Sequence, residues 1–312
     1  MAAQSVTIAG ARPVATRWSR IRRNRQALLF CYLALAPVLV LFFYVRVVPI
    51  IESVALSFYR WDLIKPLKPF IGLRNYTDLL SDENFRLALE NTLIYSVATV
   101  VVSTLLALPL AVFLARKGWV AAVYQTIYFL PVITPLVPMA IAWRWIYDYN
   151  YGLFNYVLSF FGIPAVPWLT SPDIALWAII IMSIWKGLGY SLILFLVGIR
   201  NIPESYLEAA SLDGASPWQR FWHVTLPLLR PYLLVALLLR AIFEFRAFDN
   251  VYVMTGGGPA NATLLLSVYT YQASFIQFDL SLGSAASWVM LLIALVACLG
   301  FVALIGQRET RS

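Results

Sequence analysis

The sequence predicts an all-α membrane protein whose chain crosses the bilayer six times. Three observations support this: 61% of the residues are hydrophobic, only 12% are charged, and the mean hydropathy is +0.78. Such a composition lies outside the range of soluble domains. A spanning helix needs about 20 predominantly apolar residues. Windows of that kind occur at residues 28–51, 92–115, 119–146, 174–199, 232–254 and 284–306.

The distribution of basic residues predicts the orientation in the membrane, because Lys and Arg near span ends are retained in the cytoplasm. One side, which includes both chain ends, holds thirteen basic residues, and the other side holds five. We therefore expect cytoplasmic tails at 1–27 and 307–312 around a membrane domain at 28–306. The basic amino-terminal tail can contact anionic membrane lipid. Since the net charge of +8 follows this topology, nucleic-acid binding is not indicated.

Three connections are expected outside. The first, 52–91, is long and mixed in charge, and should form a small cap on the membrane domain. The second, 147–173, is rich in aromatic residues that suit the membrane interface, which indicates a short helix and a turn. The third begins with the turn signal TGGGPANAT and continues into LLLSVYTYQASF, which predicts a short outward-facing helix.

Enzyme motifs and metal-ligand clusters do not stand out in the sequence. Cys31 and Cys298 fall in the first and last windows, which indicates neither a disulfide framework nor a metal site. There is no HExxH, GxSxG or GxxxxGKS/T motif, and the one histidine, His223, lies in a predicted cytoplasmic loop. We expect a non-enzymatic protein with no catalytic residue, no metal and no cofactor of its own.

The polar stretch at 200–231 separates two very apolar segments and carries its own helix signals. Gly214 suits the left-handed end of a helix through ESYLEAASLD. Ser216 and Gln219 can form a capping box, with Pro217 at the first position of a second helix. Two short helices joined by a tight turn are therefore expected on the cytoplasmic side.

The first of these helices has a face of mostly small side chains. Tyr206, Ala209, Ala210 and Asp213 share that face, because they are spaced i, i+3, i+4 and i+7. Periodicity alone also allows an amphipathic hairpin lying on lipid. Such helices usually carry Lys or Arg on the polar face, however, and neither occurs between residues 203 and 215. The pattern favours a docking surface for another protein.

The run EAASLDGASPWQRFWHVTLP resembles the EAA loop of permease subunits in binding-protein-dependent ATP-binding-cassette (ABC) importers. Four other stretches, FIGLRNY, NTLIYS, PWLTSP and VMTGGGP, are similar to the carbohydrate-uptake branch of that family, which includes maltose, trehalose and glycerol-phosphate permeases. The resemblance extends from the first span to the last. It places the ATPase-coupling positions of the motif at Glu208, Ala209, Ala210, Asp213, Gly214, Leu226 and Pro227.

The resemblance implies the type I ABC importer permease fold, a location in the bacterial cytoplasmic (inner) membrane, and a set of partners. These are a second, related permease subunit, an ATP-binding-cassette ATPase dimer that binds ATP and Mg²⁺, and an extracytoplasmic solute-binding protein. The implied function is import of a small-molecule sugar or sugar-like solute. In such importers the EAA loop inserts into a groove on the ATPase and transmits its closing to the membrane helices.

Ionisable residues within the predicted spans mark either structural ion pairs or a transport path. Lys186 lies halfway along the fourth span, Arg240 and Glu244 share one face of the fifth, and Arg246 follows. An Arg240–Glu244 or Lys186–Glu244 pair that only fixes helix packing is one explanation. Three cations cannot all be neutralised by one anion, however. Some of them are expected to face a water-filled cavity, another chain or a ligand.

The substrate pathway is expected beside these charges. The resemblance to maltose permeases implies lining positions, and Lys186 on the same helical face completes the candidate set. Arg240, Glu244 and Ala247 depart from the residue types of those permeases, which leaves an anionic substrate such as a sugar acid or glycerol phosphate ester open. A secondary transporter driven by an ion gradient, with Glu244 as the ion site, is the alternative mechanism. The candidate residues are Ser183, Lys186, Gly187, Tyr190, Arg240, Phe243, Glu244 and Ala247.

Overall fold

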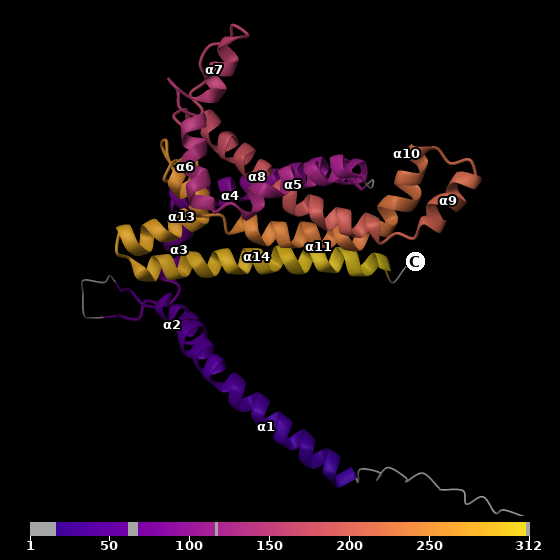
Figure 1. Cartoon of the computed structure of the whole chain (residues 1–312). Helices are drawn as coiled ribbons and strands as arrows, with labels where there is room; N and C mark the ends of the chain where they lie inside the picture. Colours follow the sequence, from indigo (N-terminus) through magenta and orange to yellow (C-terminus); the bar gives the residue numbers. More distant parts are fainter. Residues whose placement is uncertain (1–16, 62–67, 116–117, 310–312) are drawn as a thin grey trace, which may run out of the picture. The chain divides into compact units, whose positions relative to one another are not determined.

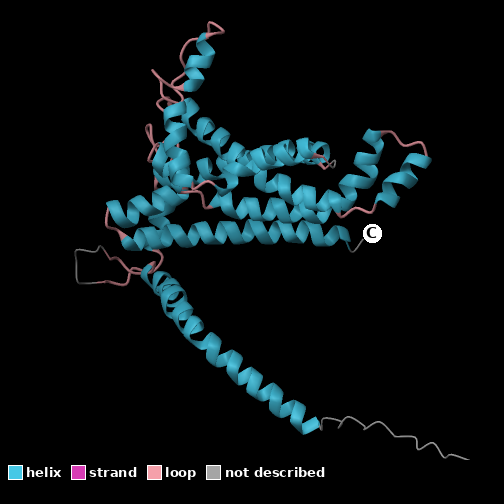
Figure 2. Cartoon of the chain, in the orientation of Figure 1, coloured by secondary structure: helices cyan, strands magenta, loops and turns pink. Residues whose placement is uncertain are grey.

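The computed structural model describes residues 17–61, 68–115 and 118–309, and most of them are helical (Figures 1 and 2). Within these ranges the one pairing of extended segments is an isolated bridge between Tyr59 and Phe70. Most of the predicted basic tail, the last three residues, and Arg116 with Lys117 lie outside the described residues. The chain divides into two compact units, Met1–Ala55 and Leu56–Ser312.

The amino-terminal unit is formed by consecutive helical segments. These are α1 (Arg17–Phe42), the π-helical turn η1 (Phe43–Val47) and α2 (Val48–Leu56). Together they contain an apolar stretch long enough to span a membrane, Ala27–Leu56. This confirms the first predicted span.

The second unit holds the remaining elements and contains the candidate site. Its core is centred on α4 and α8, which pack along each other, with α5 and α11 against them (Figure 1). The elements are α3 (Arg74–Ser81), α4 (Glu83–Leu114), α5 (Trp119–Ile133), α6 (Leu136–Ile146), α7 (Leu153–Ser159), α8 (Pro172–Arg200), α9 (Glu204–Leu212), α10 (Pro217–Arg220), η2 (Phe221–Thr225), α11 (Leu226–Phe245), α12 (Asp249–Met254), α13 (Leu266–Tyr271), η3 (Gln272–Ile276) and α14 (Leu280–Glu309).

The close approach of α5 to α8 requires a residue without a side chain. A Cβ atom at Gly189 of α8 would lie 2.0 Å from the backbone carbonyl oxygen of Tyr128 on α5. Small residues are a common way for membrane helices to bring their backbones together. The buried side chains around this centre include Tyr95 from α4 and Phe195 from α8, both fully buried.

The third predicted span, 119–146, is not a single helix. Helix α5 ends at Ile133, α6 begins at Leu136, and the two are bent by 103°. Thr134 is extended (ψ 131°) because it precedes Pro135, and the ring of a proline disfavours helical geometry in the preceding residue. The described residues therefore contain five helices able to cross a membrane, or six if this bent pair is one span.

The fifth span is displaced from its predicted window of 232–254. Its helix begins at Pro217, runs through η2 and α11, and ends at Phe245. The backbone then leaves the helix at Arg246 before the short helix α12 starts at Asp249. Hydropathy alone does not detect this interruption, because the residues on both sides of it are largely apolar.

The three connections predicted to lie outside contain the short elements expected of them. In the first loop, the buried amide of Asn75 in α3 donates to the carbonyl oxygens of Ser57 and Tyr59 at 2.7 and 2.9 Å. The second contains α7. The third has a turn in which Gly256 and Gly257 adopt positive φ, followed by α13 and η3, so the short helix predicted there is present.

Candidate functional site

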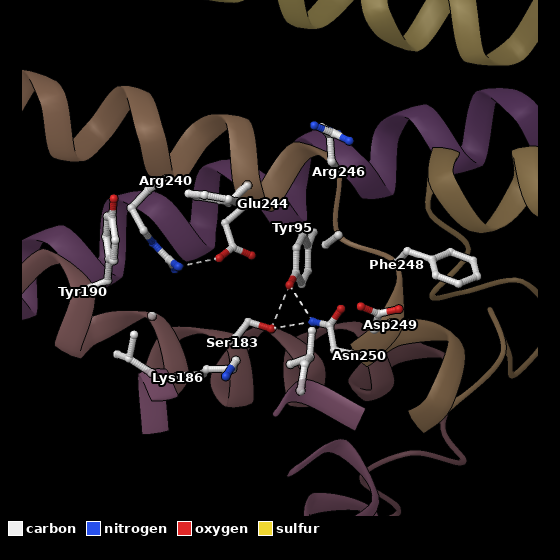
Figure 3. A pocket seen from close by; sticks show the side chains of 15 residues that line it. Tyr95, Ser183, Lys186, Tyr190, Arg240, Glu244, Arg246, Phe248, Asp249 and Asn250 are labelled. Carbon is white, nitrogen blue, oxygen red and sulfur yellow. Dashed lines mark hydrogen bonds and ion pairs between the residues drawn. The ribbon is translucent and has the colours of Figure 1, made fainter. Parts of the chain in front are cut away.

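A cavity of about 450 Å³ lies beside the centre of α8 and the carboxyl-terminal end of α11 (Figure 3). All eight residues predicted for the substrate pathway line it, although they come from segments far apart in the sequence. Seven further residues line it that the sequence analysis did not place in the pathway. The full lining is Tyr95, Val132, Leu136, Ser183, Lys186, Gly187, Tyr190, Arg240, Phe243, Glu244, Arg246, Ala247, Phe248, Asp249 and Asn250.

An ion pair forms between Arg240 and Glu244, one helical turn apart on α11, with Nη1 and Oε1 2.7 Å apart. Both side chains are buried, at 8% and 10% exposure. Burial makes each charge costly unless it is neutralised nearby, and the i, i+4 spacing brings the two together. This is one of the two pairings considered from the sequence. The Arg240 atoms Nε and Nη2 have no hydrogen-bond partner among the described residues.

Gly187 makes room for that arginine. A Cβ atom at this position would lie 1.9 Å from Nη2 and 2.1 Å from Cζ of Arg240. The guanidinium group therefore lies directly against the backbone of α8. Any larger residue at 187 would displace it.

Lys186 does not form the alternative pair with Glu244 in the described part of the chain. Its Nζ atom donates to the carbonyl oxygens of Pro131 and Thr134, at 3.0 and 2.9 Å. Both carbonyls belong to the end of α5, where the break removes their helical partners. A cation there also matches the negative end of the helix dipole. Lys186 thus lines the cavity and caps the broken helix.

Tyr95 and Asn250 are cavity residues that the sequence analysis missed. The Tyr95 hydroxyl donates to the Ser183 hydroxyl at 2.8 Å. The Asn250 side-chain Nδ2 donates to both hydroxyls, at 2.7 Å to Tyr95 and 2.8 Å to Ser183. Figure 3 shows this triangle of bonds, which links α4, α8 and α12. Uncharged polar residues in an apolar window give a weak signal, and neither Tyr95 nor Asn250 is among the lining positions that the resemblance implied.

Two aromatic rings line the cavity together with Arg240. The rings of Tyr190 and Phe243 meet edge to face, with centroids 6.3 Å apart and an interplanar angle of 78°. Phe243 is 62% exposed, so part of its ring is available for contact. The cavity therefore combines aromatic surface with buried charged and hydroxyl groups.

The predicted cytoplasmic helix pair has the expected local structure. Helix α9 ends in a turn where Gly214 adopts φ +77° and the amide of Ala215 donates to the carbonyl of Ala210 at 3.0 Å. The capping box is present, with the Ser216 amide bonded to Gln219 Oε1 at 2.8 Å and the Gln219 amide to Ser216 Oγ at 3.3 Å. Local sequence therefore accounts for both helix ends.

The predicted coupling positions divide into two groups. Glu208, Ala209, Asp213 and Gly214 are exposed on α9 and its turn, and Ala210 is half-buried. Leu226 and Pro227 are also half-buried but start α11, in the helix that leads back to the cavity.

A hollow of about 340 Å³ lies at the turn between α9 and α10, lined by residues that include Asp213, Gly214 and Arg220. The guanidinium of Arg220 ties the two helices together through a 2.7 Å bond to the Ser211 hydroxyl. Large apolar side chains are exposed on the same two helices, among them Leu212 of α9 at 89% exposure and Trp218 of α10 at 69%.

Comparisons with known proteins identify the family. Residues 103–311 match the model of the binding-protein-dependent transport system inner membrane component family. The chain is 38% identical over 256 residues to the trehalose/maltose transport system permease protein MalF of Thermococcus litoralis, covering 82% of this chain and 86% of the relative. It is 33% identical over 294 residues to the sulfoquinovosyl glycerol transport system permease protein SmoG of Agrobacterium fabrum, covering 94% and 95%.

A solved structure supports the fold. A chain from a bacterial ABC transporter involved in the import of the acidic polysaccharide alginate matches with a TM-score of 0.80 at 24% identity, covering 91% of this chain and 98% of that one. The predicted type I importer permease architecture is therefore confirmed. The chain belongs to the binding-protein-dependent transport system inner membrane component family, and it is a multi-pass permease subunit of an ABC importer rather than an enzyme.

Proposed function

We propose that this permease moves a sugar or sugar-like solute into the cytoplasm through the cavity described above. The observation that carries the proposal is the combination of the Tyr190 and Phe243 rings with the buried polar groups of Arg240 and Ser183 in one cavity. Sugars present C–H faces that pack on aromatic rings and hydroxyls that need hydrogen-bond partners. Ligand sites of this kind combine aromatic walls with a few placed polar groups. The MalF relative is named for trehalose and maltose.

An acidic sugar is the second candidate. Lys186, Arg240 and Arg246 outnumber Glu244 and Asp249 among the charged residues lining the cavity. Arg240 also keeps two buried donors free of partners in the described structure. The SmoG relative is named for sulfoquinovosyl glycerol, whose sulfonate group is anionic. A carboxylate or sulfonate on the sugar would suit these donors.

Transport requires partners that supply energy and substrate. We propose that α9, its turn and the adjacent hollow dock into a groove on a separate ATPase, which binds ATP and Mg²⁺. Exposed Leu212 and Trp218 beside a helix without basic residues suit a protein surface better than lipid. Both chain ends and this loop would then face the cytoplasm. A second permease subunit would complete the pathway, and an extracytoplasmic binding protein would deliver the sugar.

The coupling role is tested with the complete importer in proteoliposomes containing ATP. The double variant Glu208→Lys, Gly214→Asp should abolish uptake of labelled sugar while the permease remains folded. Glu204→Lys is the control for the Glu208→Lys component, because it makes the same charge reversal on an exposed site of α9 outside the motif. Undiminished uptake by the double variant would reject the coupling role.

The energy source is tested in the same vesicles. A protonophore should leave uptake unchanged as long as ATP is present. Loss of uptake on adding the protonophore would instead favour a transporter driven by an ion gradient, with Glu244 as its ion site.

A further inference from the structure

We propose that Asn250 recognises one hydroxyl group of the transported sugar, which donates to the Asn250 side-chain oxygen. This inference rests on the proposed function, because it assigns a specificity-determining residue to the same cavity. Asn250 was not among the residues expected to contact substrate. Its position at the start of α12 follows from the interruption after α11.

The orientation of the amide follows from its neighbours. The Asn250 Nδ2 atom donates toward both the Tyr95 and the Ser183 hydroxyl oxygens. The Tyr95 hydroxyl donates to the Ser183 hydroxyl, and the Ser183 hydroxyl donates toward the sulfur of Met182 at 3.9 Å. Each hydroxyl therefore meets Asn250 as an acceptor. The amide nitrogen faces them and the amide oxygen faces away, as Figure 3 shows.

The side-chain oxygen of Asn250 is the polar atom of this group of residues that lacks a hydrogen-bond partner in the described structure. Asn250 is only 4% exposed and lines the cavity, yet its Oδ1 atom has no hydrogen-bond partner among the described residues. Buried carbonyl oxygens are rarely left unpaired, since the lost hydration is not replaced. A ligand hydroxyl in the cavity would supply the missing donor. Because the acceptor is an uncharged amide oxygen, this contact would recognise a hydroxyl group of the sugar and not a charged group.

The rest of the cavity complements this acceptor. Arg240 offers only donors, at Nε and Nη2, so it suits a ring oxygen, a hydroxyl oxygen or an acidic group. Asn250 offers only an acceptor, which a deoxy position, an ether or a ketone cannot satisfy. The cavity should therefore discriminate between sugars by the presence of one particular hydroxyl. A site that holds a polar group ready for a hydroxyl rejects analogues that lack it.

The test uses the whole importer with its binding protein in ATP-loaded proteoliposomes. A panel of labelled neutral and acidic sugars first identifies one that the wild type moves. Its monodeoxy derivatives, each lacking one hydroxyl, are then compared with the parent at concentrations that saturate the binding protein. In the wild type, one derivative should be transported about three- to tenfold more slowly, the range expected for one hydrogen bond.

The decisive comparison combines a change in the protein with a change in the sugar, as in a double-mutant cycle. Asn250→Leu should slow the parent sugar by a similar factor but slow that one derivative no further, because the lost partner is already absent. The other derivatives should slow as the parent does. The inference is overturned if no derivative is slow in the wild type, or if every derivative is slowed by Asn250→Leu as strongly as the parent. An importer that moves no sugar at all overturns the proposed function as well.

A milder variant covers the case in which Asn250→Leu does not fold. Tyr95→Phe keeps Asn250 and removes one of the two hydroxyls that orient its amide. It should reduce the difference between the parent sugar and the critical derivative while leaving the ranking of the other derivatives unchanged. A uniform slowing of all sugars would instead show a purely structural role for the triangle of bonds, and would count against the inference.

Discussion

The contact between Gly187 and Arg240 allows a quantitative prediction. In Gly187→Ala the new Cβ would lie 1.9 Å from Arg240 Nη2, whereas ordinary van der Waals contact begins at 3.4 Å. The guanidinium must therefore retreat by about 1.5 Å, the difference between those two distances. Its ion pair with Glu244 is 2.7 Å long, and pairs longer than about 4 Å are no longer counted as contacts. A retreat of this size is enough to break it.

Breaking a buried pair by removing one partner costs about 3–5 kcal/mol. In Gly187→Ala the arginine moves but keeps its charge, so we expect the lower end, about 3 kcal/mol, in the free energy of unfolding. Chemical denaturation of the purified permease in detergent measures this. Gly300→Ala in α14 is the matched control, because nothing lies within 4 Å of the place that its Cβ would occupy. It should be neutral or stabilising by up to about 1 kcal/mol.

A double-mutant cycle isolates the cause. In an Arg240→Ala background the clash is absent, so adding Gly187→Ala should cost almost nothing. The reasoning is refuted if Gly187→Ala is as harmless as Gly300→Ala, or if it costs the same with and without the arginine. Uptake by the complete importer should also fall with Gly187→Ala when Arg240 is present, because the displaced guanidinium would change the lining of the cavity.

Two further predictions concern stability. Lys186→Met leaves the carbonyls of Pro131 and Thr134 without their cap and should lower the free energy of unfolding of the permease by about 1–3 kcal/mol. Lys186→Arg should lower it by less, because it keeps a cationic donor. Equal denaturation midpoints for the wild type and the Met variant would contradict this. Burial and the 2.5 Å hydrogen bond to Asp82 raise the pKa of Tyr269. Stability from this tyrosine is therefore complete below its unfolded pKa of about 10 and is lost as pH rises above that. Tyr269→Phe should flatten the alkaline decline in denaturation midpoint, and an unchanged decline would exclude the contribution.

Features that depend on neighbouring residues could be predicted from the sequence. The capping box at Ser216 and the left-handed turn at Gly214 follow from side chains within a few positions of each other, and both are present. The ion pair between Arg240 and Glu244 was one of two predicted options, because i, i+4 spacing makes contact possible without knowledge of other helices. Membrane crossing likewise follows from apolar length.

The role of Lys186 could not be predicted in this way. Its partners, the carbonyls of Pro131 and Thr134, become available only because the third span breaks between α5 and α6. Pro135 is present in the sequence, but the residues on both sides of it are apolar, so hydropathy predicted one continuous span and not a bend. Asn250 was missed for a similar reason, since it reaches Tyr95 and Ser183 only after the chain leaves α11.

The sequence by itself determined that the chain is a helical membrane protein, which residues form the polar helix pair, and which charged side chains are too costly to leave in lipid. Composition, periodicity and caps are local quantities, so they can be read along the chain. Only the tertiary structure decided which carbonyl, hydroxyl or guanidinium each buried polar group meets. Those partners lie on helices distant in sequence, and their hydrogen-bonding capacity is set by breaks and close approaches that arise when the helices pack together.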